Sequence, residues 1–227
     1  MINPALLAAG IGQSALRTRM ALYLAMDEPS GTVYLDSASG VNPGAGHGTL
    51  TRVSGKVGAG AAQFDGSTAY IDVASNPAAE IAAADMSISA WVNPTTHSAL
   101  AVVAGKTIFG NNSWALYLNT TKFWFQVRAT AASGYFAQAD ANYVTGTWVH
   151  LIGIRQAGVI TLYVNGAAQT ATGTNTEVPA TSASAFVVGA ASSHTAQLYA
   201  GQIDEVGLWS RALTAAEIAY LAGGGRP

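Results

Sequence analysis

The segment WVHLIGIRQAGVITLYVNG, residues 148–166, most constrains what this chain can fold into. It contains two runs of β-branched, aromatic and other apolar residues, which strands favour, separated by Ala157-Gly158. Gly158 can adopt the positive φ that a short hairpin turn needs, and Asn165-Gly166 supplies a second tight turn. The segment therefore predicts a β-hairpin.

The first run of this hairpin carries large side chains on both of its alternating faces. His150, Ile152 and Ile154 share one face, and Val149 and Leu151 share the other. A strand with two such faces belongs in the middle of a sheet, with another layer packed on each side. The remaining strands are therefore expected to cover it.

From residue 20 onward, the chain alternates short strand-like segments with turn residues. The segment at 86–94 alternates most cleanly, and loops are expected at 37–48, which is rich in Gly, and at 170–184. Further strands are expected at residues 21–26, 32–36, 61–66, 69–73, 100–106, 113–119, 122–129, 135–139, 185–190, 196–201 and 202–209. This pattern predicts an all-β sandwich or barrel.

The two ends of the chain carry the helix signals. Residues 1–20 are expected to form an arm or short helix, in which Asn3 caps the helix and Pro4 occupies its first position. This segment either packs on its own domain or docks on a neighbouring subunit. Near the other end, Thr214 and Glu217 form a capping box and Gly223 follows the last turn. Residues 21–227 are expected to form one domain.

Composition excludes several function classes. Only 10% of the 227 residues are charged and the net charge is −2, so no basic surface indicates nucleic-acid binding. No apolar stretch is long enough to predict membrane insertion. The chain has no cysteine, which removes disulfides and thiolate chemistry. The opening residues do not have the pattern of a signal peptide.

Five ordered segments carry a family resemblance between about Leu22 and Leu221. They are LAMDEPSGTVYLDSASG, AAQFDGSTAYIDV, MSISAWVNP, GTWVHLIGIRQAGVITLYVNG and GQIDEVGLWSRALTAAEIAYL. Together they resemble a laminin-G-like jelly roll of the concanavalin A-like lectin/glucanase superfamily. The resemblance implies two packed antiparallel sheets, one of them concave, and non-enzymatic binding. The first 20 residues have no counterpart in it.

The resemblance also implies a structural Ca²⁺ between an early strand and the last one. Asp204 matches the family's acidic position, and further oxygens are expected from Asp27 or Glu28 and from the loop that begins at Asp36. Alternatively, Asp204 accepts backbone hydrogen bonds or pairs with Arg211.

Residues 122–129 predict a surface for a ligand. Trp124, Gln126 and Arg128 share one strand face, and Tyr117 lies on the strand before it. An aromatic plate with nearby hydrogen-bond donors is what a sugar ring needs. The alternative is that these rings pack under loops or fill a subunit interface.

No catalytic motif is found. The sequence has no E-x-D-x-x-E spacing, and Asp204 and Glu205 are adjacent, so they point to opposite strand faces. It also lacks a Gly-x-Ser-x-Gly elbow, a phosphate loop and an H-E-x-x-H pair. His150 lies within a core strand and is expected to be structural.

Two functions stay open. The first is a non-catalytic surface, decoration or appendage protein of a virion, such as a phage. It would recognise glycans and assemble with itself or with other virion proteins through residues 1–20. Such a protein reaches the outside by lysis and needs no export signal. The second is a secreted or cell-surface carbohydrate-binding module of a larger polysaccharide-processing or adhesion system.

Overall fold

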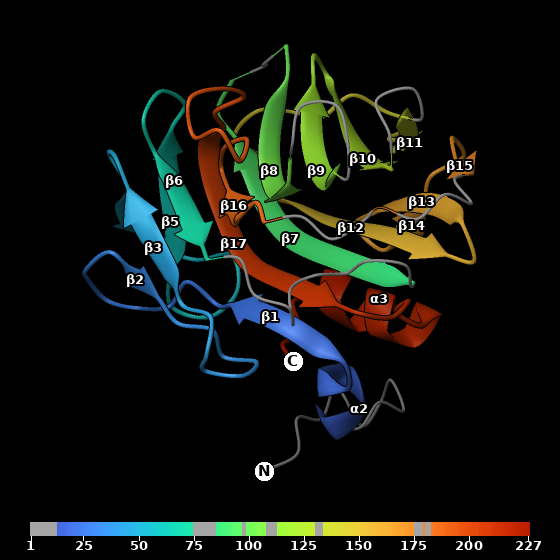
Figure 1. The fold of residues 1–227 in the computed structure, drawn as a ribbon, viewed down its shortest axis with the longest axis horizontal. Coiled ribbons are helices and arrows are strands. Elements are labelled where there is room, and N and C mark those ends of the chain that lie inside the picture. Colours follow the sequence, from blue (N-terminus) through green and yellow to red (C-terminus); the bar gives the residue numbers. More distant parts are fainter. Residues whose placement is uncertain are drawn as a thin grey trace.

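The structure is a computed structural model that describes residues 13–74, 85–96, 99–107, 113–129, 134–174, 179 and 183–227. Its described residues form two stacked sheets and two helices, and every pairing between described strands is antiparallel (Figure 1). The two-sheet jelly roll predicted from the sequence is confirmed. No described helix is long and apolar enough to cross a bilayer.

The first sheet has nine described strands. Along it run β14 (Ala167–Ala168), β13 (Val159–Val164), β12 (Val149–Gln156), β7 (Met86–Pro94), β17 (Ala200–Trp209), β5 (Ala61–Asp65) and β4 (Thr51–Val53), while β1 (Met20–Leu24) pairs with β17 and β15 (Gly173–Thr174) pairs with β13. The predicted central strand is β12, and it lies between β7 and β13 as expected.

The second sheet has eight described strands. Their order is β11 (Gly134–Gln138), β10 (Lys122–Arg128), β9 (Ser113–Asn119), β8 (Ala101–Lys106), β16 (Phe186–Val188), β6 (Tyr70–Val73), β3 (Gly44–His47) and β2 (Val33–Tyr34). The main core fills the space between the two sheets, and Leu151 of β12 and Phe125 of β10 are both buried in it.

The opposite face of the first sheet is covered by α3 (Ala215–Ala222) and α2 (Gln13–Arg17) (Figure 1). Ile152 and Ile154 of β12 pack there with Ile218 of α3. The predicted capping box is present, because the Thr214 side chain accepts from the Glu217 N–H and the Glu217 carboxylate accepts from the Thr214 N–H. Both faces of β12 are therefore buried, as its sequence predicts.

The N-terminal segment packs on its own domain in the part that the structure describes. Leu16 is fully buried, and its carbonyl accepts a hydrogen bond of 2.8 Å from the indole N–H of Trp209. Residues 1–12, including Asn3 and Pro4, lie outside the described residues. The division into an arm at 1–20 and a domain at 21–227 stays a prediction.

The predicted turns are confirmed, but some strand boundaries were wrong. Ala157-Gly158 and Asn165-Gly166 all have positive φ, as tight hairpin turns between right-twisted strands require. The strands expected at 196–201 and 202–209 are one strand, β17, because Gln197 has a φ of 55° and belongs to a loop. The loop expected at 37–48 contains β3, which pairs with β6.

Candidate functional site

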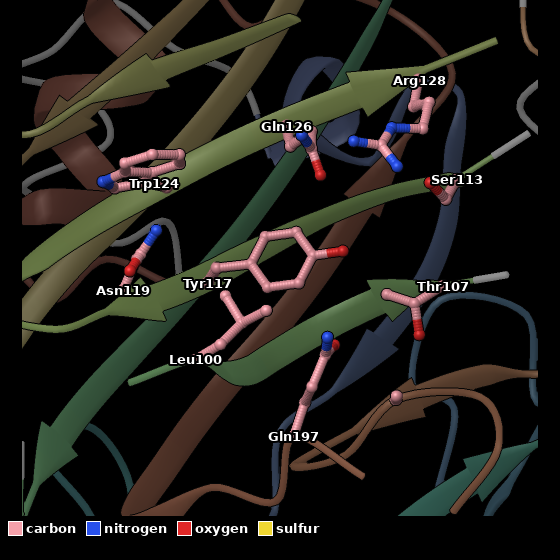
Figure 2. Close-up of a pocket in the computed structure, with 10 residues that line it drawn as sticks. Leu100, Thr107, Ser113, Tyr117, Asn119, Trp124, Gln126, Arg128 and Gln197 are labelled. Carbon is pink, nitrogen blue, oxygen red and sulfur yellow. The ribbon is translucent and has the colours of Figure 1, made fainter. Parts of the chain in front are cut away.

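The outer face of the second sheet carries the predicted ligand residues. In β10, Phe123, Phe125 and Val127 are buried toward the core, so the alternate residues point outward. Tyr117 of β9 is the cross-strand partner of Trp124. The structure therefore places all four predicted residues on one face, where they line one pocket: Tyr117, Trp124, Gln126 and Arg128 (Figure 2).

This pocket is a cavity of about 270 Å³, near the lower end of the volumes usual for small-molecule sites. Sequence reasoning missed six of its lining residues, which come from other strands and from loops: Leu100, Thr107, Ser113, Asn119, Ala191 and Gln197. Tyr117 also packs with Val102, Ala115 and Ala191 in a small apolar cluster. The pocket thus combines an apolar floor with a polar rim.

Trp124 stands between the pocket and the edge of the sheet. The ring of Phe136, in β11, stacks on its indole with a centroid distance of 4.2 Å and an angle of 11°. Trp124 is half-buried, and it also packs against the small apolar cluster that contains Tyr117. Stacking also restricts the indole, which lowers the entropy lost when a ligand binds against it.

A loop from the neighbouring β16 closes the pocket on the far side. Thr107 and Ser192 hydrogen-bond reciprocally: each backbone N–H donates to the other's hydroxyl, at 2.9 and 2.7 Å. The Val102 N–H donates to the Gln197 carbonyl at 2.9 Å. These bonds fix the backbone of the loop, and the Gln197 side chain lies at the rim opposite Gln126 (Figure 2).

Tyr117 is a hydrogen-bond donor at any physiological pH. Burial raises the pKa of its hydroxyl to about 12, and the nearby Arg128 guanidinium offsets only part of that rise. The hydroxyl is therefore neutral and can donate to a ligand oxygen.

The four carboxylates expected to hold Ca²⁺ do not meet in one place. Each has its own donors: Asp27 binds Arg226 at 2.6 Å, Glu28 binds Arg52 at 2.9 Å, and Asp36 accepts from the Tyr23 N–H at 3.1 Å. No group of three potential metal ligands occurs among the described residues. The arrangement does not fit a shared calcium site, and calcium binding stays a prediction.

Asp204, the fourth carboxylate, is fully buried and accepts hydrogen bonds from two backbone amides. They are the N–H groups of Lys56 and Val57, at 2.9 and 3.0 Å. The alternative expected for Asp204 was therefore partly right, but Arg211 pairs with Glu217 instead. Burial raises the pKa of Asp204 to about 7, and the two backbone donors offset this only in part.

This carboxylate makes stability depend on pH. Between about pH 4 and 7 the folded chain holds a proton on Asp204 that the unfolded chain releases. Stability from this group therefore falls as pH rises through that window, by up to about 1.4 kcal/mol per pH unit. We expect Asp204→Asn to remove this slope, measured by urea unfolding at pH 5, 6, 7 and 8. Parallel curves for the two proteins would contradict the assignment.

A serine and a histidine also meet inside the first sheet, but away from solvent. Ser89 Oγ lies 2.9 Å from His150 Nε2, and both residues are almost fully buried. Burial lowers the pKa of His150 to about 3, so the ring is neutral. The ring of Trp91, which is also buried, packs on it at 4.9 Å. His150 is thus buried and hydrogen-bonded within its strand, in agreement with its predicted position in a core strand.

The fold and this pocket define a class of protein: a two-sheet jelly roll with a mixed apolar and polar pocket on the outer face of one sheet. The chain belongs to the concanavalin A-like lectin/glucanases superfamily, whose laminin-G-type model matches residues 65–219. No curated protein matches it.

Solved structures share the fold at low sequence identity. The binding domain of Paraclostridial Mosquitocidal Protein 1 superposes with a TM-score of 0.74 and 14% identity, over 91% of this chain and 52% of that one. Domain 4 of AbnA, a GH43 extracellular arabinanase from Geobacillus stearothermophilus, superposes with a TM-score of 0.71 and 22% sequence identity. The superposition covers 90% of this chain and 98% of that domain. The botulinum neurotoxin serotype D ligand-binding domain superposes with a TM-score of 0.72 and 12% sequence identity, over 93% of this chain and 52% of that one. The chain thus spans about half of the toxin domains and nearly all of the arabinanase domain.

Proposed function

We propose that this protein is a non-catalytic glycan-binding domain and that the pocket over β8, β9 and β10 is its binding site. The observation that carries the proposal is the convergence of a half-buried indole and several hydrogen-bond donors on one cavity (Figure 2). The indole suits the apolar face of a sugar ring, and the amides of Gln126 and Gln197 suit its hydroxyls.

Two structural neighbours support a glycan as the ligand class. Domain 4 of the arabinanase was solved with arabinotriose, and the neurotoxin domain with N-acetylneuraminic acid. The buried Ser89–His150 pair supports a non-catalytic role, because a substrate cannot reach it through a cavity of only about 10 Å³.

Trp124→Ala tests the proposed site. We expect the 227-residue chain to bind members of a glycan array, and the variant to lose at least about tenfold in affinity by titration calorimetry. The loss follows from removal of the apolar plate on which the ring rests.

Tyr135→Ala is the matched control. Tyr135 lies on β11 beside Phe136 and is 39% exposed. It is the cross-strand partner of Val127, so its side chain lies on the face of the sheet away from the pocket. It should leave glycan affinity unchanged. Equal affinities for Trp124→Ala and the unmodified protein, or hydrolysis of the bound glycan, would count against the proposal.

Where this domain works stays a prediction, with two alternatives. One is a virion surface or appendage, with assembly through residues 1–20, and the other is a secreted or cell-surface module. The low charge of the chain suits packing against other copies. The neighbouring genes separate the two, since capsid and tail genes favour the first and polysaccharide-degrading enzymes the second.

A further inference from the structure

Arg128 is the only charged residue among the described residues that line the pocket. Its side chain makes no hydrogen bond or ion pair with any described residue, and its Nε atom is buried without a partner. Other arginines of the described chain are paired: Arg52 with Glu28, Arg211 with Glu217 and Arg226 with Asp27. Among the described residues, no carboxylate compensates the positive charge that Arg128 places at the pocket wall.

Such a group favours an anionic ligand. A partly buried charge without a counter-ion is unfavourable, and a carboxylate in the pocket would supply the missing partner. The guanidinium is planar and presents two parallel N–H donors, a geometry that matches the two oxygens of a carboxylate. No acidic side chain lines the described pocket, so none competes for it or repels an anion.

The surrounding donors point to the same space. Figure 2 shows the Arg128 guanidinium directed toward the Tyr117 hydroxyl, with the Gln126 amide beside it and Gln197 opposite. The Tyr117 hydroxyl stays neutral because burial raises its pKa to about 12, so it donates to an anion and does not repel it.

We propose that the pocket selects acidic saccharides, with the sugar carboxylate bound by Arg128 while a sugar ring lies against the part of Trp124 that lines the pocket. This inference rests on the proposed glycan-binding function, and it narrows the ligand to sugars that carry a carboxylate. Arg128 follows Trp124 by four residues, and both lie on one face of β10 with Gln126 between them. At about 3.3 Å per residue this spacing suits contact with adjacent sugar units.

The test is an array of sialylated, uronate-containing, sulfated and neutral glycans, followed by titrations with matched pairs. The pairs are 3′-sialyllactose with lactose, and trigalacturonate with its methyl ester, which has the same rings without charge. We expect the acidic member to bind more tightly, and Arg128→Gln to lower its affinity about 10- to 100-fold while leaving the neutral member unchanged. The preference should weaken as NaCl is raised.

Lys122→Gln is the control for charge. Lys122 lies on the same strand but outside the lining of the pocket, where its Nζ donates to the Asp140 carbonyl at 3.1 Å. It should bind acidic glycans like the unmodified protein, and Arg128→Lys should recover only part of the affinity because it lacks the planar fork.

The outcomes separate this inference from the proposed function. Neutral glycans bound in a Trp124-dependent way, with no acidic preference, would overturn the inference and leave the function standing. Binding of sulfated glycans alone would overturn the carboxylate assignment. Binding of no glycan at all would overturn both.

Discussion

Replacing Gly153 by alanine is expected to lower the free energy of unfolding by about 3 kcal/mol, at the upper end of the cost of overpacking a core. Gly153 lies in β12, and a Cβ atom there would come within 2.3 Å of the Phe125 ring on the facing sheet. The glycine therefore allows the two sheets to approach closely at the centre of the core. For a domain of this size, the melting temperature should fall by about 6–12 °C, measured by thermal unfolding.

A second variant tests whether this contact is the cause. Phe125→Leu shortens the opposing side chain, so Gly153→Ala should cost clearly less in that background than alone. We therefore expect the double variant to lose less free energy of unfolding than the sum of the two single losses. If Gly153→Ala is neutral, or costs the same in both backgrounds, the sheets do not meet at this point.

Arg226→Met is expected to lower the free energy of unfolding by about 2–3 kcal/mol at pH 8, because it leaves Glu205 buried without its cation. Arg226 forms ion pairs with Glu205 and Asp27, and Glu205 also accepts a hydrogen bond from the Tyr23 hydroxyl. Only about a third of the Arg226 side chain is exposed, and the Glu205 side chain is 6% exposed. The loss should be measured by urea unfolding.

The pH dependence of this variant identifies the cause. Burial already raises the pKa of Glu205, and loss of Arg226 removes the main group that offsets the rise, leaving only the hydrogen bond from Tyr23. Glu205 then takes up a proton on folding, so the loss should shrink as pH falls from 8 to 5. Glu205→Gln in the same chain should recover part of the stability. A loss that is equal at both pH values would contradict this account.

Regular alternation made most strands predictable. MSISAWVNP matches β7 residue for residue, and the two faces of β12 were assigned correctly because apolar residues fill both. The short strands β3 and β4 were missed because GAGH and TRV have no apolar period, and pairing with β6 and β5 alone makes them strands. Propensity and periodicity do not report such tertiary pairing.

The ligand-binding face was also readable, but the full pocket was not. Alternation in β10 places Trp124, Gln126 and Arg128 together because one strand supplies all three. Thr107 joins them because β8, which it follows, pairs with β9, and Gln197 joins them through the loop that follows β16. Their separation in the sequence hides both. The pairing of Glu205 with Arg226 is hidden for the same reason, because chain folding brings the C-terminus beside β17.

The most direct test of the proposed site is a crystal structure of the 227-residue chain with the glycan that gives the strongest signal on the array. We expect a sugar ring against Trp124 in the pocket, with sugar oxygens within hydrogen-bond distance of Gln126 or Gln197. A glycan bound elsewhere on the molecule, with the pocket over β8, β9 and β10 empty, would contradict it.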